Sequence, residues 1–332
     1  MKKFLLVLGL ATAGHCAYWH RKAQKQVNPQ FWGPRLYLAP LQGFYASLGY
    51  LLPEPQRNYL RVAQPVAGVK VERIELSSAG VSLSSFLNLP AQRQSEGAVL
   101  FIHGGGHLLS SAGPAQTYAS ALARDLGVPV LNVEYRNAGE APFPADLDDC
   151  YKALQWLQSS GQKYGFDPSL IAVCGQSAGG GLAASLAQRA LDAGNPLNFQ
   201  ALIYPMLDDR TTDRSDRQGR GTYAWTPLDN KIAWNTYLGG QAGAPSLPAY
   251  AAPARRQNLA GLPPAWIGVG DQDLFYPEGW DYHQRLLQAG VESKFHQVQG
   301  MYHAADMIFP ESQLIRDFYS SMLSALRASF EN

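Results

Sequence analysis

From about Ala98 to the C-terminus, short apolar runs alternate with longer stretches of helical composition. The apolar runs are rich in β-branched residues, as buried strands are. Strands that alternate with helices pair in parallel, because each helix carries the chain back across the sheet. The pattern therefore predicts an α/β fold with a mostly parallel, twisted sheet and helices on both faces.

The expected elements follow from this alternation. Central strands are expected at 99–102, 128–133, 171–174, 201–204, 265–270 and 291–298, and helices near 117–124, 146–158, 180–193, 277–288 and 312–329. Upstream, the alternating runs 69–76 and 81–89 flank a Ser77–Gly80 turn, which predicts an antiparallel hairpin at the edge of the sheet. The expected sheet has about eight strands.

Composition narrows the classes of partner. With 332 residues, of which 46% are hydrophobic, the chain can bury a large core. A net charge of +1 gives no reason to expect nucleic acid or an anionic surface as a partner. The cysteines, Cys16, Cys150 and Cys174, are too few for a disulfide scaffold, and no pair of them has metal-ligand spacing. We expect neither a metal nor a cofactor.

The N-terminus resembles a targeting segment. Lys2-Lys3 precedes the apolar stretch Phe4–Ala13, which is too short to span a bilayer. We interpret residues 1–20 as a signal or anchor segment, which favours export or N-terminal anchoring over a cytoplasmic location. The alternative is an amphipathic first helix of a cytoplasmic protein. Any association with a membrane would come through this segment.

Two stretches interrupt the alternation, at about Gln30–Arg61 and Met206–Leu238. An insertion at the second point would lie over the carboxyl ends of the strands, where open α/β sheets bind ligands. We therefore expect one domain over residues 21–332, with a helical cap formed by about 25–65 and 206–240.

The second insertion contains aromatic and charged residues with different expected roles. Its aromatic residues either line a substrate pocket or form the small core of the cap, which is the commoner case; they are Tyr223, Trp225, Trp234 and Tyr237. The mixed charges of Asp208–Arg220 predict a solvated, mobile loop.

One serine has an unusual setting. Gly175-x-Ser177-x-Gly179 follows the apolar run Leu170–Cys174 and precedes a helical stretch. A strand that reverses into a helix within a few residues strains the central residue and leaves no room for bulky neighbours. The pattern predicts a nucleophile elbow that exposes the hydroxyl of Ser177.

A serine nucleophile needs a base, and the base is best oriented by a carboxylate. In sheets of this kind the acid and then the histidine follow the nucleophile along the chain, each in a loop after a strand. Asp273 and His303 meet this order, and Asp271 is the less favoured acid because it lies nearer the strand end. His296 is expected within a strand and His283 within a helix, so both are less favoured as bases.

Backbone N–H groups that stabilise an oxyanion are expected at two places. Ala178 supplies one donor at the start of a helix, where the helix dipole also favours negative charge. The loop His103-Gly104-Gly105-Gly106 follows the strand that ends at Ile102, and its glycines allow the main chain to approach a substrate closely. No Gly-Lys-Ser/Thr follows, so the loop does not fit a phosphate-binding loop.

Together these residues resemble the bacterial hormone-sensitive-lipase family of carboxylesterases, which has the α/β-hydrolase fold. The likeness covers roughly Ala98–His303. Beyond the elbow and the glycine loop, it is carried by further stretches, namely Val133–Glu140 with Phe143–Ala145, Tyr204–Asp208, Pro253–Arg255 with Leu259–Pro264, and Gly270–Phe275.

The resemblance implies roles for these residues. Ser177 would be the nucleophile, His303 the base and Asp273 its orienting acid. Gly105 and Gly106 would join Ala178 in the oxyanion hole, with His103 and Gly104 shaping the loop. The chain departs from the family at Gln176, where an acidic residue is usual, and at Gly139, where a proline is usual. Neither change removes a catalytic group, but Gln176 makes substrate preference less transferable than the reaction.

The expected function is hydrolysis of short- to medium-chain acyl esters through an acyl-enzyme intermediate. An amidase or arylformamidase would use the same three side chains. A non-catalytic small-molecule binder is the alternative from another class, because the family also resembles plant gibberellin receptors. The retained serine, acid and histidine favour catalysis.

Overall fold

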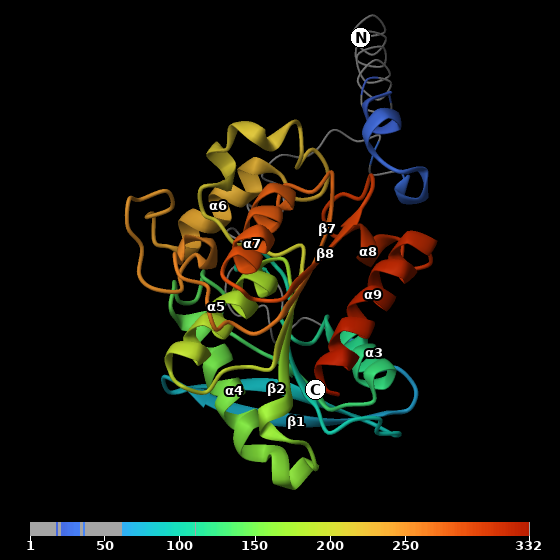
Figure 1. Ribbon diagram of the computed structural model, residues 1–332, viewed down its shortest axis with the longest axis vertical. Helices are drawn as coiled ribbons and strands as arrows, with labels where there is room; N and C mark the ends of the chain where they lie inside the picture. The colour runs from blue at the N-terminus through green and yellow to red at the C-terminus, as the bar shows by residue number, and fades with distance from the viewer. Residues whose placement is uncertain (1–17, 19–20, 34–35, 37–61, 110, 332) are drawn as a thin grey trace, which may run out of the picture.

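The computed structural model describes residues 18, 21–33, 36, 62–109 and 111–331 (Figure 1). The predicted signal or anchor segment, residues 1–20, lies outside this part of the chain except for Tyr18. Residues 37–61 of the expected cap also lie outside it. The interpretations of both segments therefore stay predictions.

The described chain forms one eight-stranded sheet in the order β1-β2-β4-β3-β5-β6-β7-β8. All pairs from β4 through β8 are parallel, and β2 is antiparallel to both β1 and β4. The strands are β1 (Val69–Ser78), β2 (Val81–Pro90), β3 (Ala98–Ile102), β4 (Val130–Val133), β5 (Ile171–Gln176), β6 (Phe199–Ile203), β7 (Ala265–Gly270) and β8 (Ser293–Val298). The predicted mostly parallel sheet is confirmed.

The labelled α-helices are α3 (Gln116–Leu126), α4 (Ala145–Tyr164), α5 (Ala178–Asp192), α6 (Pro227–Tyr237), α7 (Tyr276–Gln288), α8 (Ala305–Ile308) and α9 (Gln313–Ser329). Short 3₁₀ helices occur at Pro29–Phe31, Pro168–Leu170, Thr211–Asp213, Ser215–Arg217 and Pro253–Arg255. The predicted ranges 117–124, 146–158, 180–193, 277–288 and 312–329 correspond to α3, α4, α5, α7 and α9.

Strand boundaries differ from the prediction where local chemistry intervenes. β4 begins at Val130 rather than at residue 128. Pro129 has no N–H to donate to a neighbouring strand, although its carbonyl accepts from Val99. The predicted edge hairpin is confirmed: β1 and β2 meet at the pair Ser78–Val81. Ala79 and Gly80, with φ of 49° and 79°, form the two-residue turn.

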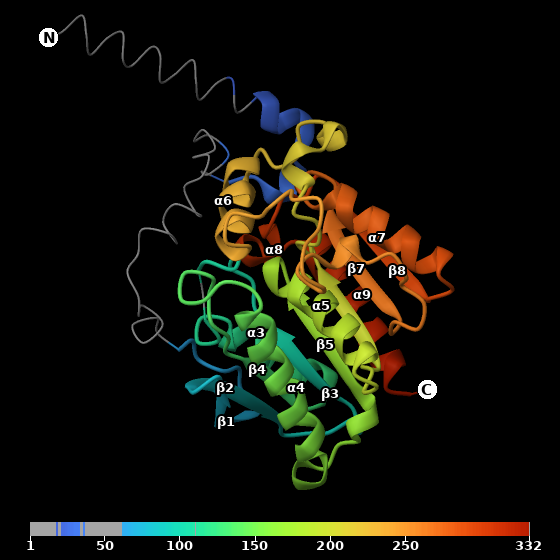
Figure 2. The ribbon, with the colours of Figure 1, turned by 90° about the vertical axis from the view of Figure 1, so that its left-hand side faces the viewer.

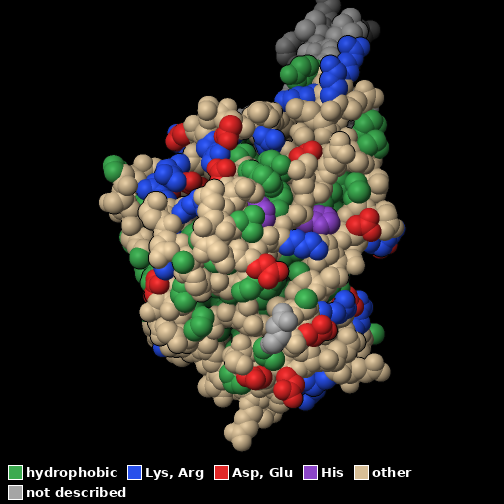
Figure 3. All heavy atoms as spheres, in the orientation of Figure 1, with side chains coloured by type: hydrophobic (Ala, Val, Ile, Leu, Met, Phe, Trp, Pro, Cys, Tyr) green, Lys and Arg blue, Asp and Glu red, His purple; other side chains and the backbone are tan. Residues whose placement is uncertain are grey.

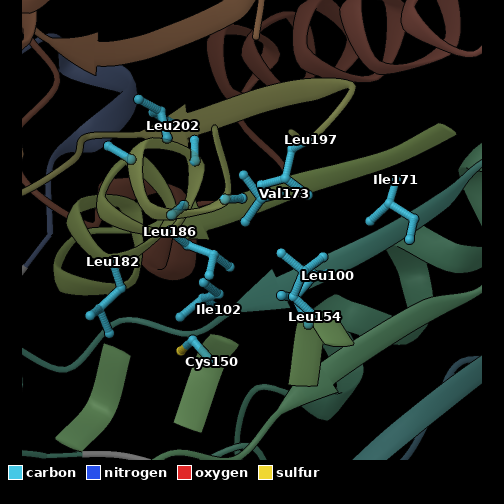
Figure 4. Packing of buried hydrophobic residues seen from close by; sticks show 14 of the residues in the cluster. Leu100, Ile102, Cys150, Leu154, Ile171, Val173, Leu182, Leu186, Leu197 and Leu202 are labelled. Carbon is cyan, nitrogen blue, oxygen red and sulfur yellow. The ribbon is translucent and has the colours of Figure 1, made fainter. Parts of the chain in front are cut away.

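Each face of the sheet is covered by helices, and alternate strand residues pack against them (Figures 1 and 2). Leu100 and Ile102 of β3 pack in one cluster with Cys150 and Leu154 of α4, as Figure 4 shows. Val99 and Phe101 of the same strand belong to the opposite cluster, together with residues of α3 and α9. Successive residues of a strand point to opposite faces of the sheet, so this strand contributes apolar side chains to the helix layers on both faces.

Helices α6 and α8 lie beyond the carboxyl ends of the parallel strands, at the same end of the sheet as the start of α5 (Figure 2). A third cluster joins this region to the sheet, because Trp234 and Tyr237 of α6 pack in it with Ala178 of α5. Helix α6, which belongs to the second insertion, therefore packs at the carboxyl ends of the parallel strands.

The prediction of a solvated, mobile loop at Asp208–Arg220 is wrong for its first residues. Asp208 and Asp209 are buried, and Thr211 is fully buried. Asp209 forms a paired contact with Arg255, with an Nη2–Oδ2 distance of 2.7 Å. A carboxylate can be buried when a guanidinium neutralises it and satisfies its oxygens, and the loop is fixed by such pairs.

Acidic and basic side chains are mixed over the face seen in Figure 3. Within the described residues, no helix combines the length and apolar character needed to cross a membrane.

Candidate active site

Ser177 lies between the last residue of β5 and the first residue of α5, with φ 55° and ψ −120°. A β-carbon added at Gly175 would be 2.1 Å from the carbonyl oxygen of Gly179. One added at Gly179 would be 2.2 Å from the carbonyl oxygen of Ile102. Both contacts are too short for any side chain, so the two glycines allow the sharp turn that the sequence predicts.

The structure brings Ser177, His303 and Asp273 together. The Ser177 Oγ lies 2.9 Å from His303 Nε2, and His303 Nδ1 lies 2.7 Å from an Asp273 carboxylate oxygen. All three side chains are buried, and Asp273 is fully so. They come from the ends of three different strands, β5, β7 and β8.

The hydrogen bonds assign the tautomer of His303. A carboxylate oxygen only accepts, so Nδ1 must carry the hydrogen that it donates to Asp273. Nε2 is then left to accept from the hydroxyl of Ser177. The other oxygen of Asp273 accepts the N–H of Phe275 at 2.9 Å, which fixes the carboxylate.

The less favoured candidates lie elsewhere. The Asp271 carboxylate accepts the N–H of Gly300 at 2.7 Å, so it anchors the loop that leads to His303. His283 contacts the Ser293 hydroxyl at 2.8 Å, and His296 lies against Trp266 and Phe318.

Aromatic rings surround the imidazole of His303. Tyr204 and Phe275 meet it edge-on, with centroid distances of 4.8 and 5.1 Å. The hydroxyl of Tyr204 donates to both carboxylate oxygens of Asp306, at 3.0 and 3.1 Å. Burial raises the pKa of Asp306 to about 6, although the Tyr204 hydrogen bond and the nearby His303 act in the opposite direction.

The glycine loop lies against the elbow. A β-carbon at Gly104 would be 3.3 Å from that of Ser177. Gly105 and Gly106 have φ of 135° and 62°, and no hydrogen bond between described residues uses their N–H groups. Tyr135 supports the loop: its hydroxyl donates to the carbonyl of His103 at 2.8 Å, and its ring stacks on the His103 imidazole.

Ala178 begins α5, so its N–H precedes the first intrahelical hydrogen bonds. This free end of the helix adjoins Ser177. The glycine loop lies against Ser177 at Gly104, and α5 begins directly after Ser177. Both are therefore sources of backbone N–H groups of the kind that stabilise an oxyanion.

The predicted cap aromatics divide into two groups. Trp234 and Tyr237 are almost fully buried in the cluster beneath α6, and Tyr223 is buried in another cluster, so these three are core residues. Trp225 belongs to the same cluster as Trp234 and Tyr237, but its ring also reaches the site. Its ring would lie 2.2 Å from a β-carbon at Gly106, and its centroid is 6.2 Å from that of His303.

Sequence reasoning missed the buried pair His107–Asp146, whose Nδ1 and Oδ2 atoms are 2.8 Å apart. His107 directly follows the glycine loop, but Asp146 lies on α4, and no periodicity or motif links the two. It also missed the Tyr204–Asp306 contact beside His303. The spacing of His303 and Asp306 was the only available sequence signal, and three residues do not specify a side-chain direction.

Among the residues that the structure describes, no group of three or more His, Cys, Asp or Glu side chains is arranged to hold a metal ion. Cys150 and Cys174 are buried free thiols.

The sheet order, the elbow and the three joined side chains define a hydrolase of the α/β class. A family model described as the alpha/beta hydrolase fold matches residues 99–307. The chain belongs to this family and, within it, to the bacterial hormone-sensitive-lipase-like carboxylesterases that its motifs resemble.

Individual relatives and solved structures agree with this family assignment. The chain is 36% identical to Esterase LipI of Mycobacterium tuberculosis over 62% of this chain and 64% of that protein, so the alignment spans just under two thirds of the relative. It is 32% identical to an acetyl-hydrolase of Streptomyces hygroscopicus, over 75% of this chain and 81% of that protein. The structure of a bacterial heroin esterase superposes with a TM-score of 0.83 and 30% identity, covering 93% of this chain and 99% of that one.

Proposed function

We propose that the protein is a serine carboxylesterase that hydrolyses short- to medium-chain acyl esters through an acyl-enzyme intermediate. The observation that carries this proposal is the continuous contact from Ser177 through His303 to Asp273. The esterase names of its relatives and structural neighbours support the same reaction.

The geometry supports a specific proton route. His303 Nε2 takes the hydroxyl proton while Ser177 Oγ attacks the ester carbonyl, and Asp273 stabilises the imidazolium that forms. The carbonyl oxygen becomes an oxyanion that accepts from the N–H groups of Gly105, Gly106 and Ala178. The imidazolium then protonates the leaving alcohol, and the same nitrogen takes a proton from water as the acyl-serine is hydrolysed.

A preference for small acyl groups is supported by Trp225. Its ring lies against Gly106 and near His303, so it takes up space beside the glycine loop. The similarity to an acetyl-hydrolase points the same way.

An amidase or arylformamidase would use the same three side chains, and a panel of matched esters and amides separates these activities. A non-catalytic binder is the alternative, and such a protein would not need a contact between the serine and the base. The 2.9 Å distance from Ser177 to His303 favours catalysis.

The test is the variant S177A with p-nitrophenyl acetate and butyrate. We expect loss of at least about a thousandfold in kcat, since the nucleophile is removed while the oxyanion donors remain. A fluorophosphonate probe should label the wild-type protein and not the variant. Full activity in a folded S177A protein would show that the nucleophile is misassigned.

A further inference from the structure

His107 occupies a buried and strained position directly after the glycine loop. Its side chain is 2% exposed, and its φ is 60°, a region that residues with a side chain seldom adopt. A histidine held in this conformation must be fixed by its surroundings, because the backbone itself opposes it.

The first fixing contact is with α4. His107 Nδ1 lies 2.8 Å from an oxygen of Asp146, whose side chain is also 2% exposed. The carboxylate can only accept, so Nδ1 carries the hydrogen. The second oxygen of Asp146 accepts the N–H of Leu147 at 2.7 Å in the first turn of α4. The pair therefore joins the glycine loop to the start of a helix.

The second fixing contact is with α6. The imidazole of His107 stacks on the ring of Tyr237, with centroids 3.9 Å apart and planes 16° apart. The carbonyl of Tyr237 in turn accepts the N–H of Phe143 at 2.9 Å, just before α4. The backbone of His107 is held as well, since its carbonyl accepts the N–H of Ala138 at 2.7 Å.

Apart from the Trp225 ring, which lies against Gly106, the loop has few other constraints near Gly105 and Gly106. The carbonyl of Gly105 accepts from Leu108 and Leu109, which lie on the other side of His107. A turn with two successive glycines at positive φ has wide conformational freedom, so its two ends must hold it. His103 and Tyr135 hold one end, and His107 holds the other.

We propose that His107, fixed by Asp146 and Tyr237, is a positioning residue that holds the N–H groups of Gly105 and Gly106 in place for the oxyanion. The inference rests on the proposed function. His107 and Asp146 form a second buried His–Asp pair, in addition to His303 and Asp273. This second pair touches no reacting atom and acts on the glycine loop through the main chain. Contacts to α4 and α6 also link the cap helix to the proposed oxyanion donors.

The experiment uses the full chain and the variants H107A, H107N and D146N. In H107N the side-chain amide can replace Nδ1 as a donor to Asp146, and asparagine tolerates a positive φ. Two matched controls change the same residue types elsewhere. H283A removes another buried histidine with a side-chain partner, and D148N alters an acidic residue in the same first turn of α4.

The readouts are kcat and KM for p-nitrophenyl acetate and the inhibition constant of an aryl trifluoromethyl ketone, which forms a tetrahedral oxyanion with a reactive serine. We expect H107A and D146N to lower kcat about tenfold or more, with KM changed less than about threefold. The ketone should bind correspondingly less tightly. H107N should recover part of the loss, and both controls should stay near wild type.

An unchanged kcat in folded D146N or H107A overturns the inference, as does an equal fall in H283A. If H107A fails to fold, D146N and H107N decide the question. Failure of the proposed function looks different: the wild-type protein would not hydrolyse the ester, or S177A would remain active.

Discussion

At the scale of single residues, the ring of Trp225 occupies space beside the glycine loop. Its ring is held by a hydrogen bond from its Nε1 to Asn230 at 3.2 Å, and it is 8% exposed. Replacing it with alanine removes the ring from its place between Gly106 and His303.

We expect W225A to shift the preference toward longer acyl chains. The ratio of kcat/KM for p-nitrophenyl octanoate over acetate should rise about tenfold or more, since each added methylene in an apolar pocket contributes about 1 kcal/mol. The acyl-length series measures this ratio. The control W280A removes an exposed tryptophan on α7 and should leave the profile unchanged. An unaltered profile in W225A would place the acyl pocket elsewhere.

The raised pKa of Asp306 predicts that the stability of the protein depends on pH. Its pKa in the folded protein is about 6, above the ordinary value of 3.8. A carboxyl group whose pKa is higher in the folded than in the unfolded protein contributes most to stability at pH values below its unfolded pKa. This contribution to stability is lost as the pH rises through the folded pKa of about 6. We expect the wild-type protein to lose about 2 kcal/mol of unfolding free energy, relative to D306N, between pH 4 and pH 7.

Urea unfolding of both proteins at several pH values measures this difference. Parallel curves for the wild-type protein and D306N would contradict the raised pKa.

At the level of elements, the elbow depends on close packing between the start of α5 and the end of β3. A β-carbon at Gly179 would meet the carbonyl oxygens of Ile102 and His103 at 2.2 and 2.3 Å. These contacts are with backbone atoms and not with the end of a flexible side chain, so a methyl group must displace the helix or the strand.

We expect G179A to destabilise the protein by about 3 kcal/mol and to lower kcat, because Ser177 moves with the helix. The matched control is G279A, also within a helix, where an added β-carbon would meet only ordinary contacts at 3.7 Å or more. Helix propensity alone favours alanine at both positions. Denaturant unfolding and p-nitrophenyl acetate turnover measure the two effects, and equal stability of the two variants would contradict the argument.

Elements were predictable from sequence where one face or both faces of a strand are buried. The composition of the apolar run predicts a strand at 171–174, and the structure extends this fully buried strand to Gln176. The alternation of polar and apolar residues predicts the hairpin β1–β2. The prediction of a solvated loop at Asp208–Arg220 is wrong at Asp208, Asp209 and Thr211, which are buried. The partner that neutralises Asp209 is Arg255, far along the chain. A run of charged residues predicts a solvent-exposed loop only when no residue from a distant part of the chain pairs with those charges.

At the level of the whole molecule, residues 28–31 near the N-terminus support the loop that carries His303. The N–H of Asn28 donates to the carbonyl of Gly300 at 3.1 Å. Phe31 is fully buried and packs with Phe309, which follows α8. Two parts of the chain that lie about 270 positions apart are thus in contact close to the loop that carries His303.

We expect F31A to lower the free energy of unfolding by about 3 kcal/mol through the cavity that it leaves. It should also reduce kcat, because the loop from Gly300 to His303 loses support. Thermal melting and ester turnover measure both effects. The control L287A removes a half-exposed side chain of α7 and should change neither. Retained stability in F31A would show that this segment does not support the loop.

The sequence by itself determined the α/β alternation, the elbow around Ser177 and the chain order of serine, acid and histidine. The alternation and the elbow are local features, because burial sets a period along the chain and a strained turn demands glycine. The chain order follows from the known order of such residues in sheets of this kind. The preference for Asp273 over Asp271 also followed from position after a strand, and the contact of Asp273 with His303 agrees with it.

Only the tertiary structure decided which side chains meet across the fold. It pairs His107 with Asp146, places Tyr204 against Asp306, and brings Trp225, alone among the four cap aromatics, beside Gly106 and His303. Such contacts depend on the direction of individual side chains from separate elements. That direction is set by packing between the layers, and no spacing within one segment encodes it.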